Sequence, residues 1–295
     1  SPYQVPATLN IIQHVEYGLG AWAVEGGIYS IPKAMHRLAE QIGVHFQWNS
    51  PVDRILYDGR RDIVGIGVAG RPIHYDIVVS NADVTPTYRD LLKDTEASLY
   101  KRYQQLEPSS SGLVFYWGIG RSFPELDLHN IFFSSDYEKE FGDIFERARC
   151  PDDPTVYLNI TSKITEDNAP EGKENWFVLV NAPYNQGQDW DEETQRTRSA
   201  VIRRVSHDLG VDIEQFIEQE DVLTPPMIED QTSSHRGSLY GISSNTRMAA
   251  FARHQNRRTR YKGLYFCGGS AHPGGGMPLA VLSGKIAADL VCKYE

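Results

Sequence analysis

Hydrophobic and polar positions follow two different periods along this chain, and together they predict a mixture of helices and strands. The clearest helical period covers 31–42, where apolar residues recur every three or four positions and leave one apolar face. Ser30 is suited to cap the start of this helix, and Gly43 is suited to end it. Apolar runs and period-two alternation then predict strands at 44–48, 52–57, 63–68 and 73–79. The first part of the chain is therefore expected to be a helix followed by a small β-meander.

The middle of the chain predicts a different arrangement from its two ends. A helical stretch at 85–106 precedes strands at 112–119, 155–161 and 176–182, and a long helix follows at 191–209 with Asp191 as its N-cap. Because strands and helices do not alternate strictly here, this segment is typical of an α+β region. The last part returns to α/β order, with a short apolar strand at 263–267, a glycine-rich loop at 268–276 and a helix at 279–292.

Length and composition indicate a folded protein of two parts. The 295 residues are about twice the length of a typical domain, and 40% of them are hydrophobic, which excludes wholesale disorder. The formal net charge of -10 argues against nonspecific binding of nucleic acid. The three cysteines, Cys150, Cys267 and Cys292, form no CxxC pair, which excludes a disulfide scaffold and favours a reducing compartment. The nine histidines show no metal-ligand spacing, so we predict no metal site.

The strand, glycine loop and helix at 263–292 carry the most informative local pattern. Consecutive glycines allow the backbone to approach a ligand closely, and some of them can adopt a positive φ. The helix that follows presents unpaired N–H groups and a partial positive charge at its first turn. This arrangement favours a phosphate, or an electron-rich ring that gains negative charge on reduction. The alternative is a glycine-rich connection that only lets the strand and the helix pack together.

Two other segments match a dinucleotide-binding fingerprint by their letters but not by their context. The GxGxxG match at 65–70 is followed by a predicted strand, whereas the fingerprint requires a helix that faces the pyrophosphate. The looser match at 18–23 runs into Glu25-Gly26-Gly27, which interrupts any helix. We therefore expect no complete nucleotide-binding fingerprint in this chain.

Three further features each allow an ordinary structural interpretation as well as a functional one. Ser234 and His235 are adjacent, but neither an acidic partner nor a nucleophile elbow accompanies them. The basic run at 253–262 is either a solvated loop or a contact for anionic lipid headgroups. The aromatic residues at 115–117 are typical of a core, although the wall of an apolar tunnel requires the same residue types.

No apolar run reaches the roughly 20 residues that a membrane-spanning helix needs.

Several motifs give the chain a family resemblance over nearly its whole length. They are WAVEGG at 22–27, NSPVDRI at 49–55, DIVVSNAD at 76–83, LTP at 223–225, GSLYG at 237–241 and LYFCGGSAHPGGGMP at 264–278. In this order they resemble the bacterial-type phytoene desaturases, and the HPGGGMP block is the most specific of them. Within that family the chain is similar to the hydroxycarotenoid 3,4-desaturases.

The resemblance implies an FAD-dependent enzyme that desaturates a carotenoid such as phytoene or a hydroxycarotenoid. It implies a fold of the α/β plus α+β class, in which a mixed-sheet substrate domain at 85–255 interrupts a Rossmann-like FAD-binding domain at 1–84 and 256–295. Val52 is then expected at the adenine end of FAD. The loop residues Gly268, Gly269, Gly275, Gly276 and Met277 are expected to approach the ribityl chain and the isoalloxazine ring. The expected location is cytoplasmic, with peripheral contact at the inner face of the cell membrane.

The chain also departs from the family pattern. The family opens with a strand, GxGxxG and helix, which this sequence lacks, so we expect the C-terminal part of a longer protein that binds FAD weakly alone. At 251–256 the chain has FARHQN where the family usually has an Arg-Pro pair. No catalytic acid or base and no electron acceptor can be assigned. Two alternatives stay open: another flavoenzyme of the amine oxidase or retinol saturase type, and a non-enzymatic module that binds an apolar ligand.

Overall fold

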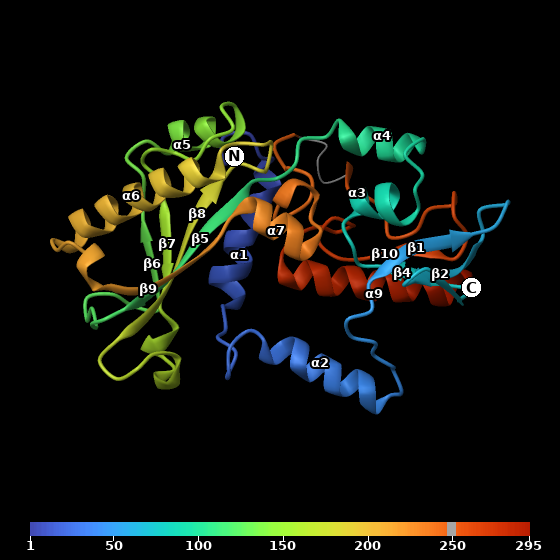
Figure 1. Ribbon diagram of the computed structural model, residues 1–295, viewed down its shortest axis with the longest axis horizontal. Coiled ribbons are helices and arrows are strands. Elements are labelled where there is room, and N and C mark those ends of the chain that lie inside the picture. Colours follow the sequence, from blue (N-terminus) through green and yellow to red (C-terminus); the bar gives the residue numbers. More distant parts are fainter. Residues whose placement is uncertain (247–251) are drawn as a thin grey trace.

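Two lobes lie side by side in the computed structural model, which describes residues 1–246 and 252–295 (Figure 1). One lobe is built on a five-stranded sheet with strand order β6-β7-β8-β5-β9. The other contains a three-stranded meander and a parallel pair of strands. Helix α2 (Ser30–Gln41) lies apart from both sheets, and none of its residues is buried.

The five-stranded sheet is antiparallel throughout and carries the larger core. Its strands are β5 (Ser111–Ile119), β6 (His129–Phe132), β7 (Val156–Asn159), β8 (Glu174–Ala182) and β9 (Ile217–Leu223). Every second residue of β8 is buried, as the period of a strand with one covered face requires. These residues pack with Val201 and Val205 of α6 (Trp190–Leu209), and α5 (Tyr137–Phe145) lies near one end of α6. Trp117 and Trp176 are the largest side chains that are buried in this core.

The second lobe is built from segments at both ends of the chain. The meander contains β1 (Val52–Tyr57), β2 (Ile63–Val68) and β3 (Arg71–His74), and the parallel pair contains β4 (Val78–Ser80) and β10 (Leu264–Phe266). The helices are α3 (Val84–Pro86), α4 (Ser98–Gln104), α7 (Pro225–Thr232) and α9 (Met277–Tyr294). Over both lobes and the segment before α2, the shorter helical pieces among the described residues are η1 (Ala7–Asn10), α1 (Ile11–His14), η2 (Val15–Leu19), η3 (Thr87–Leu91), η4 (Thr161–Lys163), η5 (Glu166–Asn168), η6 (Glu214–Phe216) and η7 (His235–Gly237).

Most predicted elements are confirmed, within a few residues at their ends. The prediction of a strand at 44–48 is wrong, because this segment pairs with no strand among residues 1–246 and 252–295. Phe46 and Trp48 stack on each other instead, with ring centroids 5.5 Å apart, and both stay exposed. The predicted strand at 73–79 is two short strands, β3 and β4, in different sheets. The predicted helix at 85–106 is broken into α3, η3 and α4, and Lys93 between the last two has a φ of 52°.

Two helix caps and four elements differ from the sequence prediction. Tyr29 takes the N-cap position of α2 without a side-chain bond, and Asp189, in place of Asp191, accepts the N–H of Glu192 at the start of α6. Strands β6 and β9 and helices α5 and α7 were not predicted. The boundaries at 84/85 and 255/256 stay predictions.

The two fingerprint-like segments have no nucleotide-binding geometry. Gly65 and Gly67 lie inside β2, and a strand, β3, follows Gly70. A Cβ atom on Gly65 would lie 2.0 Å from the carbonyl oxygen of Ile73, so this glycine permits close approach of two strands. The match at 18–23 ends in irregular backbone after η2. Rejection of both matches is therefore confirmed.

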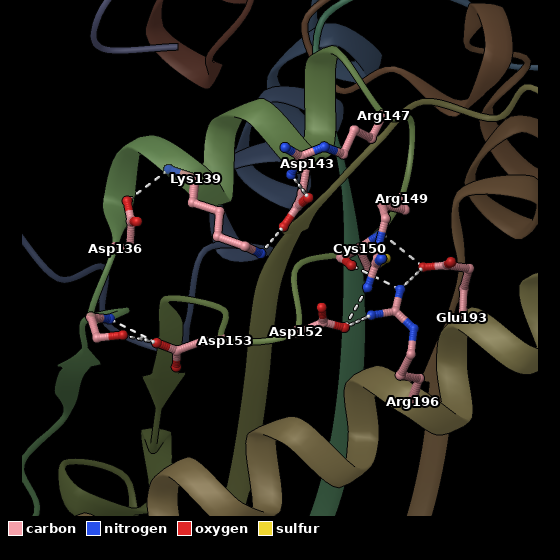
Figure 2. A network of polar contacts seen from close by, with 11 residues as sticks. Asp136, Lys139, Asp143, Arg147, Arg149, Cys150, Asp152, Asp153, Glu193 and Arg196 are labelled. Atoms are coloured by element: carbon pink, nitrogen blue, oxygen red, sulfur yellow. Dashed lines mark hydrogen bonds and ion pairs between the residues drawn. The ribbon is translucent and has the colours of Figure 1, made fainter.

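A network of charged side chains fastens the 147–153 loop between α5 and α6 (Figure 2). Arg196 donates to Asp152, to Glu193 and to the carbonyl oxygen of Cys150, at 2.6, 2.6 and 2.8 Å. The N–H of Cys150 donates to Glu193 at 2.7 Å. Burial raises the pKa of the Cys150 thiol to about 12, so this cysteine stays protonated and acts as a packing residue.

Low pH is expected to destabilise the fold around α5, because it protonates the carboxylate of Asp143. Burial opposes the charge of its carboxylate, but hydrogen bonds from Lys139 at 2.7 Å and Arg147 at 2.5 Å outweigh burial and hold its pKa below 3.8. A carboxyl whose pKa is lowered by folding stabilises the fold above its unfolded pKa, and this stabilisation is lost as the pH falls through the folded pKa. Between about pH 5 and pH 3, we expect the free energy of unfolding of the wild-type protein to fall by about 1 kcal/mol more than that of the Asp143→Asn variant.

Urea unfolding of the two proteins across that pH range measures this difference. Asp167→Asn, at an exposed position with no ion pair in the described part of the chain, is the control and should leave the pH slope unchanged. Parallel pH slopes for Asp143→Asn and the wild-type protein would contradict the assignment.

Candidate functional site

The carboxyl ends of the two parallel strands bring distant parts of the chain together. β4 pairs with β10 in parallel register, and the N–H of Cys267 continues the pairing by donating to the carbonyl oxygen of Ser80 at 3.0 Å. Both following segments, 81–83 and 267–276, therefore emerge at the same edge. In open α/β sheets this edge is where ligands bind.

The glycine loop after β10 is shaped by contacts that a side chain would prevent. A Cβ atom on Gly268, where φ is 96°, would lie 2.5 Å from Oδ1 of Asn81. A Cβ atom on Gly275 would lie 2.6 Å from the ring of Tyr240. Gly276 has a φ of 100° and open space around it, and it precedes α9 without a side-chain cap. The loop therefore offers bare backbone and the uncapped first turn of α9 to a ligand, which fits a flavin.

A buried amide fixes the base of this loop. Nδ2 of Asn256 lies 3.0 Å from the carbonyl oxygen of Phe266, 2.9 Å from that of His272 and 3.0 Å from Oγ of Ser283. Oγ of Ser283 also donates to the carbonyl oxygen of His272 at 2.7 Å. Asn256 thus joins β10, the glycine loop and α9 through one side chain.

Arg253 ties the same loop to the 240–242 segment. Its Nη1 donates to the carbonyl oxygen of Tyr240 at 2.8 Å and to that of Gly269 at 3.3 Å, and its Nη2 donates to that of Ile242 at 3.4 Å. Burial lowers the pKa of its guanidinium. The interpretation of 253–262 as a solvated loop is therefore wrong in part: His254, Asn256 and Tyr261 are buried, whereas positions 255, 259, 260 and 262 are exposed. Phe251, which begins the FARHQN departure from the family, lies outside the described residues.

His254 lies beneath the loop as a neutral packing residue. It is fully buried, its Nε2 lies 3.1 Å from the hydroxyl of Tyr88, and its Nδ1 lies 2.6 Å from the carbonyl oxygen of Gln255. Burial lowers its pKa to about 3. The basic and polar letters of this segment gave no indication of its burial, because its partners are distant in sequence.

A cavity of about 260 Å³ lies between the glycine loop and the 232–241 segment. Its wall includes Asp83, whose Oδ1 accepts the N–H of Thr85 at 2.9 Å and whose Oδ2 accepts that of His235 at 3.3 Å. Burial raises the pKa of Asp83 and lowers the pKa of His235 to about 4. The hydroxyl of Ser234 has no partner among the described residues, so Ser234 and His235 form no catalytic pair.

The structure places the residues that the resemblance implied as follows. Gly268, Gly269, Gly275 and Gly276 belong to the loop described above, and a Cβ atom on Gly269 would lie 3.6 Å from Cα of Gly275. Met277 begins α9 and is half-exposed, while Val52 begins β1, pairs with Val68 and lies in a different sheet. The roles of these six residues in FAD binding stay predictions.

Comparisons with known proteins give a consistent result. The chain is 44% identical to a 1-hydroxycarotenoid 3,4-desaturase of Flavobacterium sp. (strain P99-3), over 99% of this chain and 59% of that protein. It is 37% identical to a zeta-carotene-forming phytoene desaturase of Myxococcus xanthus, over 98% of this chain and 56% of that protein. The chain thus spans less than two thirds of the length of these relatives, and the sequence resemblance to carotenoid desaturases is confirmed.

Solved structures show the same fold at low identity. An oxidoreductase from Methanosarcina mazei matches with a TM-score of 0.58 and 16% identity, over 91% of this chain and 54% of that one. Cyclohexylamine oxidase from Brevibacterium oxydans matches with a TM-score of 0.56 and 15% identity, over 88% and 52%. The expected fold class is confirmed.

The family comparison covers almost the whole chain. The model of the flavin containing amine oxidoreductases matches residues 7–292, and this range includes both lobes and the glycine loop. The expected flavin cofactor is thereby supported. The chain belongs to the flavin containing amine oxidoreductase family.

Proposed function

We propose that this chain acts in an FAD-dependent enzyme that desaturates a carotenoid. The observation that carries the proposal is the glycine loop at the shared edge of β4 and β10, held by Asn256 against α9. The 44% identity to a protein named as a carotenoid desaturase supports the substrate class.

In this proposal the chain binds and orients, while the cofactor carries the redox chemistry. A bound flavin would supply the two-electron oxidant for a reaction in which one saturated carbon of the substrate loses a hydride and the neighbouring carbon loses a proton. Gly268, Gly269, Gly275, Gly276 and Met277 would hold the ribityl chain and the ring, and Val52 would hold the adenine end. The first turn of α9 offers N–H groups to an electron-rich part of the cofactor.

The free face of the five-stranded sheet suits an apolar chain. Phe115 and Trp117 point into the core, whereas Tyr116 between them lies on the opposite face and is 42% exposed. Its ring lies 5.6 Å from that of Phe177, which lies 6.4 Å from that of Tyr157. We propose that this aromatic face contacts the polyene, because a hydrocarbon gains affinity chiefly by burial against apolar surface.

We also propose a cytoplasmic location with peripheral contact at the inner face of the cell membrane, where an apolar substrate accumulates. In the part of the chain that the structure describes, no helix is both long enough and apolar enough to cross a bilayer. The electron acceptor is left open.

Expression of the complete reading frame in a bacterium that accumulates acyclic carotenoids tests the proposed function. We expect FAD to copurify with the protein and the extracted carotenoid to gain a double bond, seen as a red-shifted absorption band and a mass loss of two hydrogens. Primary amines should not be oxidised. Oxidation of an amine with an unchanged carotenoid would overturn the proposal in favour of an amine oxidase.

A further inference from the structure

A second pocket, of about 470 Å³, lies on the polar side of α2 and shares no lining residue with the cavity beside the glycine loop. Its wall is formed by Tyr29, Pro32, Lys33, His36, Arg37 and Trp48. Positions 33, 36 and 37 occupy the side of the helix opposite the apolar positions 35, 38 and 42. The volume lies in the range of pockets that hold small molecules.

Stacked aromatic rings fix one wall of this pocket. The ring of Phe46 lies 4.1 Å from that of His36 and 5.5 Å from that of Trp48, and the planes of Phe46 and Trp48 differ by only 8°. Trp48 is nevertheless 69% exposed, so Phe46 supports one face of the indole while the other stays open. An exposed aromatic face that is held in place is a platform on which a planar ring can stack.

The pocket also gathers positive charge in a chain whose formal net charge is -10. Lys33 and Arg37 lie one helical turn apart, and among the described residues neither forms an ion pair. Nζ of Lys33 lies 5.1 Å from the ring centroid of Tyr29, so the cation is next to a second exposed ring. None of the lining residues and none of those in the first turn of α2 is acidic. The pocket therefore attracts an anion.

His36 adds a polar atom without a partner. Its Nδ1 lies 3.5 Å from Oε2 of Glu40, whereas its Nε2 is buried and has no hydrogen-bond partner in the part of the chain that the structure describes. Buried polar atoms without partners are uncommon, and a polar ligand atom is one way to satisfy them. The pocket thus combines a stacking platform, two cations and an unused hydrogen-bonding group.

We infer that this pocket binds a nucleoside monophosphate, with the base stacked on Trp48 and the phosphate between Lys33 and Arg37. A phosphate monoester carries a charge of about -1.5 to -2 near neutral pH, which matches two cations. A hydrocarbon would leave both cations without a partner, and a single carboxylate would neutralise only one of them. The inference goes beyond the proposed function and does not depend on it.

Calorimetric titration of the protein from its complete reading frame tests this inference. FAD itself carries an adenine ring and phosphates, so the protein is first loaded with FAD to fill the flavin site. Adenosine 5′-monophosphate, adenosine and inorganic phosphate are then titrated separately. We expect the monophosphate to bind at least about tenfold more tightly than either of the other two, because only it uses both the platform and the cations. Its affinity should fall as salt is added.

Two variants locate the binding. Trp48→Ala and Arg37→Gln should each weaken binding of the monophosphate about tenfold, and Arg37→Gln should also reduce the dependence on salt. Both side chains are exposed, so the fold should tolerate the changes. The matched controls are Trp22→Ala and Arg71→Gln, because these exposed residues of the same types do not line the pocket. Neither should change the affinity.

The outcomes separate this pocket from the flavin site. Binding of the monophosphate to FAD-free protein only would overturn the inference, because the nucleotide would then occupy the flavin site. Equal affinities of the wild-type protein, Trp48→Ala and Arg37→Gln would overturn the assignment to this pocket, as would an absence of binding. Equal affinities for adenosine and its monophosphate would overturn the role of the two cations. Turnover of the carotenoid is measured separately, so none of these results decides the proposed function.

Discussion

Replacement of Asn256 by alanine is expected to lower the free energy of unfolding by about 3 kcal/mol. The Asn256 side chain is 3% exposed, and its amide donates to carbonyl oxygens of Phe266 and His272, on β10 and on the glycine loop. Alanine would leave these oxygens buried with one partner fewer, and it would open a small void beside Ser283 of α9. Asn256→Asp should be no better, because a carboxylate would then face carbonyl oxygens.

Urea unfolding followed by far-UV circular dichroism measures this loss. Asn168→Ala is the control, because the amide of Asn168 donates to Oγ1 of Thr161 at 2.8 Å on the surface and should contribute less than about 1 kcal/mol. If both variants lose the same stability, Asn256 does not hold the three elements together. If only Asn256→Ala also binds FAD more weakly, its role in fixing the loop is supported.

Elements with local signals could be predicted from the sequence alone. Strands β1 and β2 and helix α2 are confirmed within one or two residues, because alternation and helical period depend only on neighbouring residues. Rejection of the GxGxxG match at 65–70 succeeded for the same reason, since the following residues predicted a strand. The glycine loop was also visible, because a strand, several glycines and a helix are consecutive in the chain.

Features that depend on distant partners could not be predicted. The segment 44–48 has the pattern of a strand, but a strand forms only where another strand pairs with it. Strand β9 was missed because four of its seven residues are charged or polar and follow one another at 218–221, yet it pairs with β5 over Val114–Ile119. Its exposed positions hide the apolar alternation that usually reveals a strand.

The candidate site is non-local in the same sense. Its cavity is formed by 81–83, 228–241 and 269–270, which no spacing in the sequence relates to one another. The buried positions of His254 and Asn256 and the half-buried position of Arg253 lie in a run that composition describes as basic and polar. The expected contacts of Val52 and Met277 with FAD come from the family motifs alone. The fold shows where these two residues lie but does not test the contacts.

Gly275→Ala is expected to weaken FAD binding about thirtyfold, which follows from the space around this residue. A Cβ atom here would lie 2.6 Å from Cδ1 of Tyr240 and 3.0 Å from its Cα, and backbone atoms cannot move aside as a flexible side chain can. Gly275 does not have a positive φ, so alanine fits its backbone and the effect arises from the contact alone. The loop must shift away from Tyr240, and its backbone N–H groups then no longer meet the cofactor in the proposed arrangement.

The chain supplies a matched control for this prediction in the helix that follows the loop. Nothing lies within 4 Å of a Cβ atom on Gly284, inside α9, so Gly284→Ala should stabilise the helix by about 0.5–1 kcal/mol and leave FAD affinity unchanged. Titration of the protein from its complete reading frame with FAD, followed by quenching of flavin fluorescence, measures both affinities. Equal affinities of the two variants would show that the loop can move without loss of binding, and the flavin contact would then have to be sought elsewhere than at Gly275.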